Sequence, residues 1–410
     1  MLENEAVLKA HAAGTRVTPA VLVLGGSTFM GRETVHALLQ LPARVCVVNR
    51  GRSYWGTRDP SNGRVARVVA DRRDKHSFSE RLDEVTTKLE EKWALVADFS
   101  AYDGADISCA LKGLRGRFET YAYISSDSVY EVSSAAGSGW AQHAQAQAVD
   151  ESFSQRPADD AVRKRLRKAD SYGDGKLEAE EALAAGLEHT ARGVALRLPD
   201  VIGPFDDTLR LWAYWHWLRV PDNPPQVRKQ TKRARLESST STHSFEDPPL
   251  AFVFSRDVAR FLVQLIGQRL DKKFDAVNVG SDMQVPLKDF LDLLGKASKA
   301  SKASSQGPTA EAFDEVDRPR SFLPSVERPL PLDFRHLKQT YAFQSTPLPD
   351  VLKICADWFS LACEEFPEEA AEAAMKLPAA ARNVALASAE LPPPKSPASS
   401  SNSSTSSSHS

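Results

Sequence analysis

The sequence predicts an α/β protein with a doubly wound parallel sheet and a smaller C-terminal α/β lobe. Apolar, β-type runs alternate with helix-type runs through the first half of the chain, and the first run ends in glycines. Strands that are apolar along their whole length are typical of a parallel sheet covered by helices on both faces. With 410 residues, 42% of them hydrophobic, the chain can hold a sizeable core and a second lobe.

The predicted elements follow one another in a regular order through the first half. Strands are expected within residues 20–26, 44–51, 64–74, 94–102, 120–130 and 193–203. Helices are expected within residues 32–41, 78–93, 107–116 and 176–190. The second half is less regular, with an aromatic helix at 209–220, strand–helix pairs at 250–268 and 275–297, and an amphipathic helix at 346–366.

Composition divides the chain into a leader (1–18), the sheet domain (19–204), the lobe with interleaved sheet elements (205–366) and a tail (367–410). The tail is rich in Ser and Pro and is expected to be helical or disordered. Two polar stretches inside the lobe, 228–247 and 295–311, are expected to be flexible insertions because they cannot bury enough apolar surface to fold.

Charge and cysteine usage exclude several classes of protein. Lys and Arg number 52 and Asp and Glu 54, a net charge of −2, so binding of nucleic acid or of an anionic membrane is not expected. No apolar run reaches the ~18–20 residues that span a bilayer. The N-terminus lacks a secretory pattern and the four cysteines are scattered without metal-like spacing, so a cytoplasmic protein without a metal site is expected. The basic run at 228–235 leaves nuclear import open.

Three glycines, Gly25, Gly26 and Gly31, lie between the first predicted strand and its helix. In a dinucleotide-binding fold this turn brings backbone amides and a helix N-terminus to the pyrophosphate. A side chain there would block the approach of the phosphates, which is why glycine is required. An ordinary strand–helix turn is the alternative.

This turn, "GGSTFMG", resembles the "GGTxFxG" turn of extended and atypical short-chain dehydrogenases/reductases, the NAD(P)-dependent epimerase/dehydratase family, whose fold is Rossmann-type. Thr28 replaces the middle glycine, as often happens in these relatives. The resemblance covers roughly residues 19–300. It implies cofactor contacts from the turn residues Thr28, Phe29 and Met30, from Asp71 and Arg72 near the adenine, and from Phe99, Ser100 and Ala101 along the nicotinamide side.

The end of the second strand distinguishes between NAD and NADP. NAD-binding proteins usually place an acid there, on the ribose 2′-hydroxyl. This chain has Asn49, Arg50, Gly51 and Arg52 instead, and guanidinium groups match a 2′-phosphate better. NADP is therefore the expected cofactor, with NAD as the alternative. Solvated loop charges are the other interpretation of these arginines.

The family's catalytic group is Ser/Thr, Tyr and Lys, which the resemblance places at Ser126, Tyr172 and Lys176. It implies that the lysine lowers the pKa of the tyrosine, which acts as general acid or base, while the serine polarises the same substrate oxygen. The spacing of Tyr172 and Lys176 puts both side chains on one helix face. Dehydratases of the family carry Asp-Glu after the Ser/Thr, whereas this chain has Asp127-Ser128. Elimination of water is therefore in doubt, and Asp127 is either an acid/base or a structural residue.

The stretch 170–181, "DSYGDGKLEAEE", can also be aligned with an EF-hand calcium loop. Tyr172 would then occupy the third loop position, where it cannot supply the carboxylate or amide oxygen that calcium needs. Calcium binding is therefore not expected.

Other segments also match the family or stand out by composition. Residues 198–207 resemble the segment that borders nicotinamide and substrate, and Arg256-Asp257 matches a family segment or forms a helix N-terminal ion pair. The aromatic residues of 209–220 either line a substrate pocket or belong to the core or a subunit interface: Trp212, Tyr214, Trp215 and Trp217.

The sequence therefore predicts an NAD(P)-dependent oxidoreductase of the epimerase/reductase type that acts on a nucleotide-linked sugar or similar substrate through Ser126, Tyr172 and Lys176. Family members often form dimers, so a homodimer is one assembly that the resemblance implies. The alternative is a cofactor-binding regulator or RNA-binding protein without turnover, similar to the chloroplast stem-loop-binding proteins with the same glycine turn. The complete Ser-Tyr-Lys group favours the enzyme.

Overall fold

A computed structural model describes residues 18–52, 55, 64–137, 148–219, 249–298, 331–375 and 382. Its centre is a seven-stranded sheet in the order β10-β6-β5-β4-β1-β2-β3, in which all neighbouring strands are parallel. The strands are β1 (Ala20–Leu24), β2 (Arg44–Asn49), β3 (Val65–Val69), β4 (Trp93–Asp98), β5 (Phe118–Ser126), β6 (Arg192–Leu198) and β10 (Phe274–Asn278). This is the doubly wound order, so the predicted fold class is confirmed.

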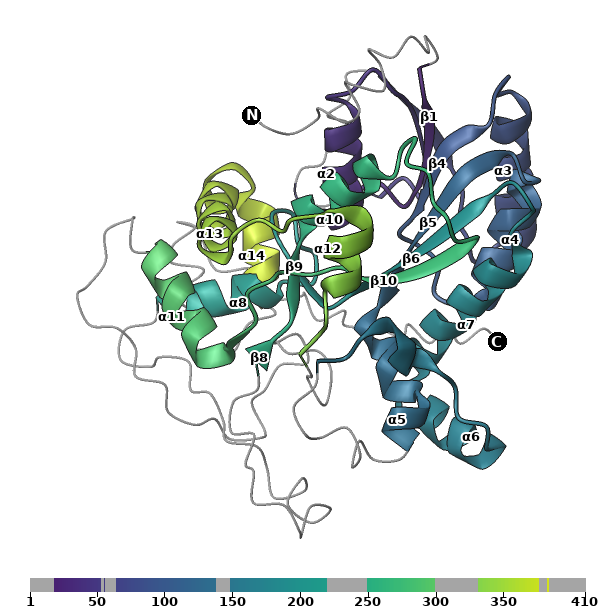
Figure 1. Ribbon diagram of the computed structural model, residues 1–410. Coiled ribbons are helices and arrows are strands. Elements are labelled where there is room, and N and C mark those ends of the chain that lie inside the picture. The colour runs from purple at the N-terminus through teal and green to yellow at the C-terminus, as the bar shows by residue number, and fades with distance from the viewer. Residues whose placement is uncertain are drawn as a thin grey trace, which may run out of the picture.

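Helices cover both faces of this sheet (Figure 1). One face carries α3 (Lys75–Thr87), α4 (Gly104–Leu114) and α7 (Ser171–Gly186), and the other carries α2 (Phe29–Leu38) and α10 (Ser255–Gln264). Side chains alternate along β1: Val21 and Val23 face the core under α2 and α10, whereas Leu22 and Leu24 face the core under α3, α4 and α7. Burial on both faces explains the continuous apolar runs.

The remaining elements build the smaller lobe and the connections to it. The lobe contains β7 (Asp200–Ile202) paired with β9 (Phe252–Phe254), β8 (Pro249–Leu250) paired with β11 (Val285–Pro286), and the helices α8 (Arg210–Trp217), α11 (Leu287–Ser298), α13 (Leu348–Glu365) and α14 (Pro367–Met375). Shorter elements connect the parts: η1 (Asp127–Val132), α5 (Ser134–Gly137), η2 (Glu151–Ser154), α6 (Asp160–Ala169) and α12 (Arg335–Tyr341). Because β10 returns to the sheet after β7, β8, β9 and α8, elements of the lobe and of the sheet alternate along the chain.

Aromatic side chains form the core of the lobe. Trp212, Tyr214 and Trp215 of α8 are buried there, which confirms the core interpretation for these three residues. Trp55, from the connection between β2 and β3, is fully buried in the same cluster, with ring centroids 5.3 Å from Trp212 and 5.0 Å from Trp358. Trp55 is therefore anchored in the lobe.

Several sequence predictions concern segments that the structure does not describe. Residues 1–17, the insertion 228–247 with its basic run, and most of 295–311 and of the tail lie outside the described residues. The described parts of the last two are helical, since α11 extends to Ser298 and α14 occupies 367–375. No helix in the described part of the chain is both long and apolar enough to cross a membrane.

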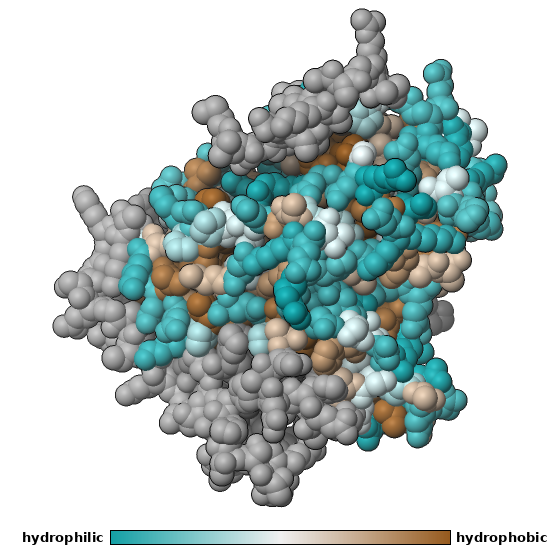
Figure 2. All heavy atoms as spheres, in the orientation of Figure 1, coloured by the Kyte–Doolittle hydropathy of each residue, from teal (hydrophilic) through white to brown (hydrophobic). Residues whose placement is uncertain are grey.

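Hydrophilic residues cover most of the described surface on the face shown in Figure 2, and hydrophobic residues appear there in small groups. Few large hydrophobic side chains are exposed anywhere in the described part of the chain, and two of them are Tyr102 (61% exposed) and Tyr172 (46%). Tyr172 is one of the predicted catalytic residues, so part of the exposed apolar surface belongs to the candidate site.

Candidate active site

The candidate site lies at the carboxyl ends of the central strands. The order of the sheet reverses at β1, which has β2 on one side and β4 on the other. In a doubly wound sheet this reversal is where the loops separate and ligands bind. Because the strands are parallel, the segments that follow β1, β4 and β5 all begin at this edge of the sheet. These are the segments that the sequence indicated as parts of the site.

Close packing explains the glycines of the turn after β1. Gly25 has φ +102°, and a Cβ there would lie 3.3 Å from the Cβ of Phe99. A Cβ on Gly31 would lie 2.5 Å from the Gly25 carbonyl oxygen. The turn leads into α2, whose N-cap residue Thr28 makes no side-chain capping hydrogen bond, while Phe29 is buried in the core. The backbone N–H groups in the first turn of α2 are therefore available to donate hydrogen bonds to a phosphate.

A buried carboxylate organises the segment after β4. Oδ2 of Asp98 accepts hydrogen bonds from Arg72 Nη2 at 2.7 Å and from the Tyr121 hydroxyl at 2.5 Å. Its Oδ1 accepts hydrogen bonds from the backbone amides of Ser100 and Ala101 at 2.9 and 3.1 Å. Nε and Nη1 of Arg72 are buried without a partner among the described residues. The ion pair fixes the turn expected beside the nicotinamide and leaves two Arg72 donors for a ligand.

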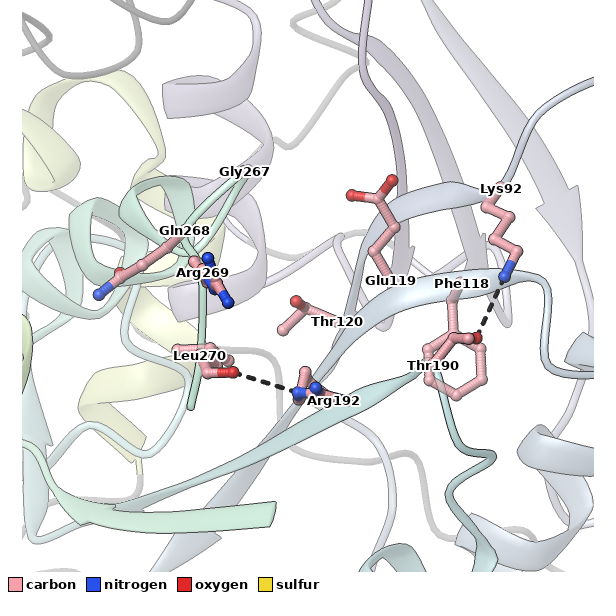
Figure 3. Close-up of a pocket in the computed structure, with 10 residues that line it drawn as sticks. All are labelled: Lys92, Phe118, Glu119, Thr120, Thr190, Arg192, Gly267, Gln268, Arg269 and Leu270. Atoms are coloured by element: carbon pink, nitrogen blue, oxygen red, sulfur yellow. Dashed lines mark hydrogen bonds between the residues drawn. The ribbon is translucent and has the colours of Figure 1, made fainter. Parts of the chain in front are cut away.

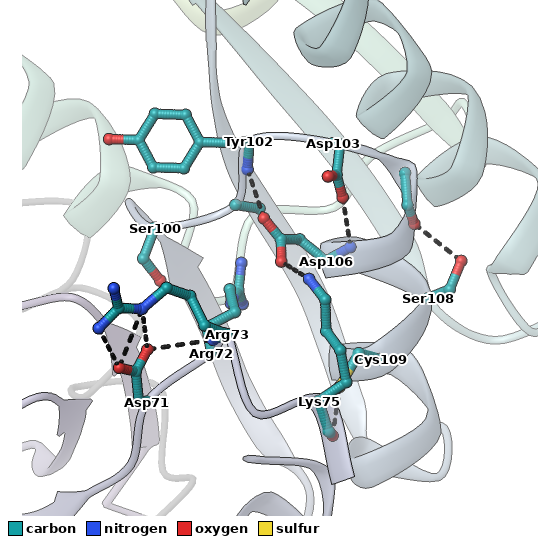
Figure 4. Close-up of polar contacts among 12 residues, drawn as sticks. Asp71, Arg72, Arg73, Lys75, Ser100, Tyr102, Asp103, Asp106, Ser108 and Cys109 are labelled. Carbon is teal, nitrogen blue, oxygen red and sulfur yellow. Dashed lines mark hydrogen bonds and ion pairs between the residues drawn. The ribbon is translucent and has the colours of Figure 1, made fainter.

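The residues expected at the adenosine end lie at the ends of β2 and β3. Asp71 accepts a hydrogen bond from Arg73 Nη2 at 2.6 Å (Figure 4), and this bond is the main reason why the Asp71 pKa falls to about 2. The positive charge of Arg50 acts in the same direction. Asn49 Oδ1 accepts a hydrogen bond from the Gly51 amide at 2.8 Å, in a turn where Gly51 has φ +72°. Arg50 is therefore an exposed cation close to Asp71.

The structure brings the predicted catalytic side chains together. Ser126 ends β5, and Tyr172 and Lys176 lie on the first two turns of α7. Lys176 is 4% exposed, and its Nζ donates hydrogen bonds to the carbonyl oxygens of Ala101 and Ile124, both at 2.9 Å. Nζ also lies 5.6 Å from the centroid of the Tyr172 ring. The lysine therefore ties α7 to β5 and to the turn after β4.

Burial sets the protonation of this pair. It raises the Tyr172 pKa to about 12, and a hydrogen bond with Ser126 is the leading influence in the opposite direction. Burial also lowers the Lys176 pKa to about 8. The tyrosine shift differs from the lowering that the resemblance implies, because loss of water around the phenol outweighs its stabilising neighbours. Tyr172 therefore carries its proton at neutral pH and can donate it.

Asp127 directly follows Ser126 and faces a second carboxylate. The Ser126 hydroxyl donates a hydrogen bond to Asp127 Oδ1 at 3.1 Å. Burial, and then the negative charge of Asp200, raise the Asp127 pKa to about 8. Asp200 is buried and forms an ion pair with Arg210, with Oδ1 and Nη1 3.1 Å apart. Asp127 therefore holds a proton near neutral pH, which supports the acid role that the sequence left open.

This carboxyl pair predicts a pH dependence. If protonated Asp127 donates a proton during turnover, the rate falls as the pH rises through about 8, and Asp127→Asn removes this alkaline limb. Asp200→Asn removes a negative neighbour, lowers the Asp127 pKa, and moves the limb to lower pH. A pH–rate profile of the three proteins checks this. The pKa of Lys176 is also about 8, but the charges that act on Lys176 include Asp98 and Arg72 and not Asp200. If Asp200→Asn does not shift the alkaline limb, the limb is assigned to Lys176.

The stretch 170–181 is not a calcium loop in this structure. Asp170 is the N-cap of α7, with Oδ1 accepting a hydrogen bond from the Gly173 amide at 2.9 Å. Asp174 and Glu181 both pair with Arg156, at 2.5 and 2.7 Å. Among the described residues, no group of three or more His, Cys, Asp and Glu side chains is arranged to hold a metal ion.

Sequence reasoning missed a buried ion pair directly behind the site. Glu180 of α7 and Arg197 of β6 are each 3% exposed, with Nη2–Oε2 and Nε–Oε1 distances of 2.7 and 3.0 Å. The Ser125 hydroxyl also donates to Glu180, at 2.6 Å. A partial signal exists in the sequence, since Glu180 lies four residues after Lys176 and hence on the same helix face. Its partner on a distant strand leaves no such signal.

Arg256 and Asp257 hold elements together rather than facing the site. Arg256 Nε donates to Glu33 of α2 at 3.2 Å, and Asp257 pairs with Arg260 at 2.8 Å. Asp257 also accepts a hydrogen bond from the Thr346 amide at 2.7 Å. These contacts join α10 to α2 and to the segment before α13, so the structural interpretation is favoured.

A separate pocket of about 400 Å³ lies at the opposite, amino-terminal edge of the sheet (Figure 3). Its lining comes from the starts of β5 and β6 and from the connection after α10: Lys92, Phe118, Glu119, Thr120, Thr190, Arg192, Gly267, Gln268, Arg269 and Leu270. Arg192 is held there by the Leu270 carbonyl oxygen at 3.1 Å. None of the predicted site residues lines this pocket.

Solved structures similar to this chain show which fold it shares with known proteins. No family model and no curated protein match the chain. The NAD+ complex of WbmH from Bordetella bronchiseptica is 16% identical, with 84% of this chain and 99% of that chain covered and a TM-score of 0.57. UDP-glucose 4-epimerase from Thermotoga maritima, with UDP-glucose, is 14% identical, with coverages of 84% and 100% and a TM-score of 0.58.

The chain has the fold of these epimerases. UDP-glucuronic acid 4-epimerase from Bacillus cereus, with UDP-glucuronic acid and NAD, gives a similar result at 16% identity, coverages of 83% and 99%, and a TM-score of 0.57. Each neighbour is covered almost completely, so the likeness includes the lobe as well as the sheet. The fold implied by the resemblance of the glycine turn is confirmed. At this level of sequence identity, the comparison shows a shared fold and no more specific property.

Proposed function

We propose that the protein is an NAD(P)-dependent oxidoreductase of the epimerase/dehydratase family that acts on a nucleotide-linked sugar. The observation that carries the proposal is the convergence of Ser126, Tyr172 and Lys176 with the glycine turn at the switch point of the sheet. The structural neighbours that bind NAD and UDP-sugars support the choice of cofactor and substrate class.

The described residues fit a dinucleotide. The uncapped start of α2 would receive its pyrophosphate, and the unpaired donors of Arg72 would face its adenosine half. The ammonium group of Lys176 has three N–H donors, and two of them bind backbone carbonyl oxygens. The third would be available to a ribose hydroxyl. A bound nicotinamide would supply the hydride acceptor and donor.

The chain's own residues would move the proton. Tyr172, protonated at neutral pH, would donate its proton to the carbonyl oxygen of a keto-sugar in the reducing direction and would take that proton back from the sugar hydroxyl in the oxidising direction. Ser126 would hold the same oxygen by a hydrogen bond. Asp127, with its raised pKa, would supply a second acid beside them. The Asp98 ion pair and the Lys176 bonds to two segments keep these groups in fixed positions, which general acid catalysis requires.

We propose NADP rather than NAD on the basis of Arg50, the exposed cation at the end of β2. NADPH should bind more tightly than NADH by ~10-fold or more, because a charge-assisted phosphate contact contributes roughly 1.5–3 kcal/mol. Arg50→Ala should remove most of this difference. Fluorescence titration with both cofactors checks it, and Arg73→Ala is the matched control because Arg73 is bound to Asp71. Equal affinities in the wild type would mean that Arg50 does not contact the 2′-phosphate.

The overall proposal is tested by native mass spectrometry of the purified protein, followed by a nucleotide-sugar panel read by cofactor fluorescence and by NMR of the sugar products, since epimerisation leaves no net change in the cofactor. We expect a co-purified or added dinucleotide to bind and at least one UDP-, GDP- or dTDP-linked sugar to turn over. Tight dinucleotide binding without turnover of any sugar would move the assignment to a cofactor-binding regulator. No dinucleotide binding at all would reject the proposal.

A further inference from the structure

One cationic side chain beside the glycine turn has no role in the arrangement described so far. Arg32 is the fourth residue of α2. Helix side chains tilt toward the N-terminus, so a residue at this position points back toward the turn. Arg32 Nη1 is buried and lacks a hydrogen-bond partner among the described residues. Because buried donors are almost always paired, an unpaired guanidinium nitrogen beside a binding turn indicates a ligand.

Phe205 holds this guanidinium in place. The guanidinium carbon of Arg32 lies 3.8 Å from the centroid of the Phe205 ring, a stacked cation–π contact. Phe205 follows β7 and has φ 61°, a backbone conformation that costs free energy for a residue other than glycine. Its ring also packs against Trp358 of α13, with centroids 5.1 Å apart. Arg32 is therefore fixed where the first helix of the sheet meets the lobe.

The charge of Arg32 is not balanced by the acid next to it. Glu33 accepts a hydrogen bond from Arg256 Nε at 3.2 Å, which directs its carboxylate to α10. Burial lowers the Arg32 pKa, and the nearby Glu33 only partly opposes this effect. Within the described part of the chain Arg32 forms no ion pair, and a partly desolvated cation of this kind matches an anionic ligand. The planar guanidinium matches phosphate oxygens.

We propose that Arg32 is a diphosphate-binding residue, with Phe205 as the side chain that orients it. The inference rests on the proposed function, since it assumes that the turn receives a nucleotide. A diphosphate can come from the dinucleotide cofactor or from a nucleotide-linked substrate. The position of Arg32 on α2, directly after Gly31, favours the cofactor.

The test measures binding of ADP-ribose, adenosine and UDP by isothermal titration calorimetry at two salt concentrations. Arg32→Gln should weaken ADP-ribose about 10- to 100-fold, since it removes a charge-assisted phosphate contact, and leave adenosine unchanged. It should also reduce the loss of ADP-ribose affinity at high salt. Phe205→Leu should have a smaller effect in the same direction. Arg256→Gln, a matched arginine that contacts α2 without facing the turn, should bind like the wild type.

Stability gives a second readout. Arg32→Met removes a half-buried cation whose Nη1 has no hydrogen-bond partner among the described residues, and it also removes the stacking on Phe205. These two effects oppose each other, so the melting temperature without ligand should stay close to that of the wild type. A large decrease would mean that Arg32 is structural and would overturn the proposal.

The binding results separate the two proposals. If Arg32→Gln binds ADP-ribose and UDP like the wild type, the diphosphate role is wrong while the proposed function stands. If the variant loses affinity for UDP but not for ADP-ribose, the diphosphate is that of the substrate. If the wild type binds neither nucleotide, the proposed function fails and the Arg32 inference falls with it.

Discussion

Tyr172→Phe is expected to lower turnover of the nucleotide-sugar substrate by ~10²–10⁴-fold, the usual contribution of general acid–base catalysis. The change removes one hydroxyl from a ring that is 46% exposed, so neither the fold nor cofactor affinity should change. The hydroxyl has a raised pKa, so it is protonated at neutral pH, and it forms a hydrogen bond with Ser126. Single-turnover kinetics with the substrate found in the panel, together with a cofactor titration, measure both quantities.

Two matched variants control this result. Tyr102→Phe removes a hydroxyl from the neighbouring exposed tyrosine, whose ring centroid is 6.3 Å from that of Tyr172, and should leave turnover within a few-fold of the wild type. Ser128→Ala does the same beside Ser126, with the two Oγ atoms 3.2 Å apart. Ser126→Ala should resemble Tyr172→Phe, and the double variant should lose less than the product of the two effects, because both side chains act on one oxygen. Turnover that survives Tyr172→Phe would reject the mechanism.

The fold could be predicted from the sequence because its signals are local. A strand buried on both faces is apolar along its length. Gly25, Gly26 and Gly31 lie so close to neighbouring atoms that a Cβ at any of them would be crowded, so glycine marks this turn in the sequence. Tyr172 and Lys176 could be paired because the helical repeat places them on one face. By contrast α6 was not predicted, because its few apolar side chains, Val162 and Leu166 among them, lie between basic residues and none of its residues is buried.

The parts of the site that could not be predicted depend on contacts between distant segments. Trp55 is anchored in the lobe by tryptophans from α8 and α13. The stacking of Arg32 on Phe205 joins two residues far apart in the sequence, and Nη1 of Arg32 has no hydrogen-bond partner in the part of the chain that the structure describes. The raised pKa of Asp127 comes from burial and then from the charge of Asp200, a residue that follows β6, the strand paired with β5. A pattern of residue types along the chain carries no record of such pairs.

Arg197→Met is expected to reduce the free energy of unfolding by about 3–5 kcal/mol, because it leaves the buried Glu180 carboxylate without its cation. Arg197 also donates to the Tyr130 hydroxyl at 3.2 Å and to the Glu151 carbonyl oxygen at 2.9 Å, so these acceptors lose a partner too. Urea denaturation followed by tryptophan fluorescence measures the change. Arg163→Met is the control, since its ion pair with Asp160 is exposed and should contribute about 1 kcal/mol or less.

The double variant Glu180→Gln/Arg197→Met separates a broken ion pair from lost packing. Without the carboxylate no unpaired charge remains, so the double variant should be more stable than Arg197→Met alone. Glu180 lies on the same face of α7 as Lys176 and accepts a hydrogen bond from Ser125, which precedes Ser126. The pair therefore also sets the position of α7 against β5. Arg197→Met, assayed where it remains folded, should therefore lower turnover with little change in the pH–rate profile. If the single variant were as stable as Arg163→Met, the pair would not hold α7 in place, and the fixed geometry of Tyr172 and Lys176 would have to come from the Lys176 hydrogen bonds alone.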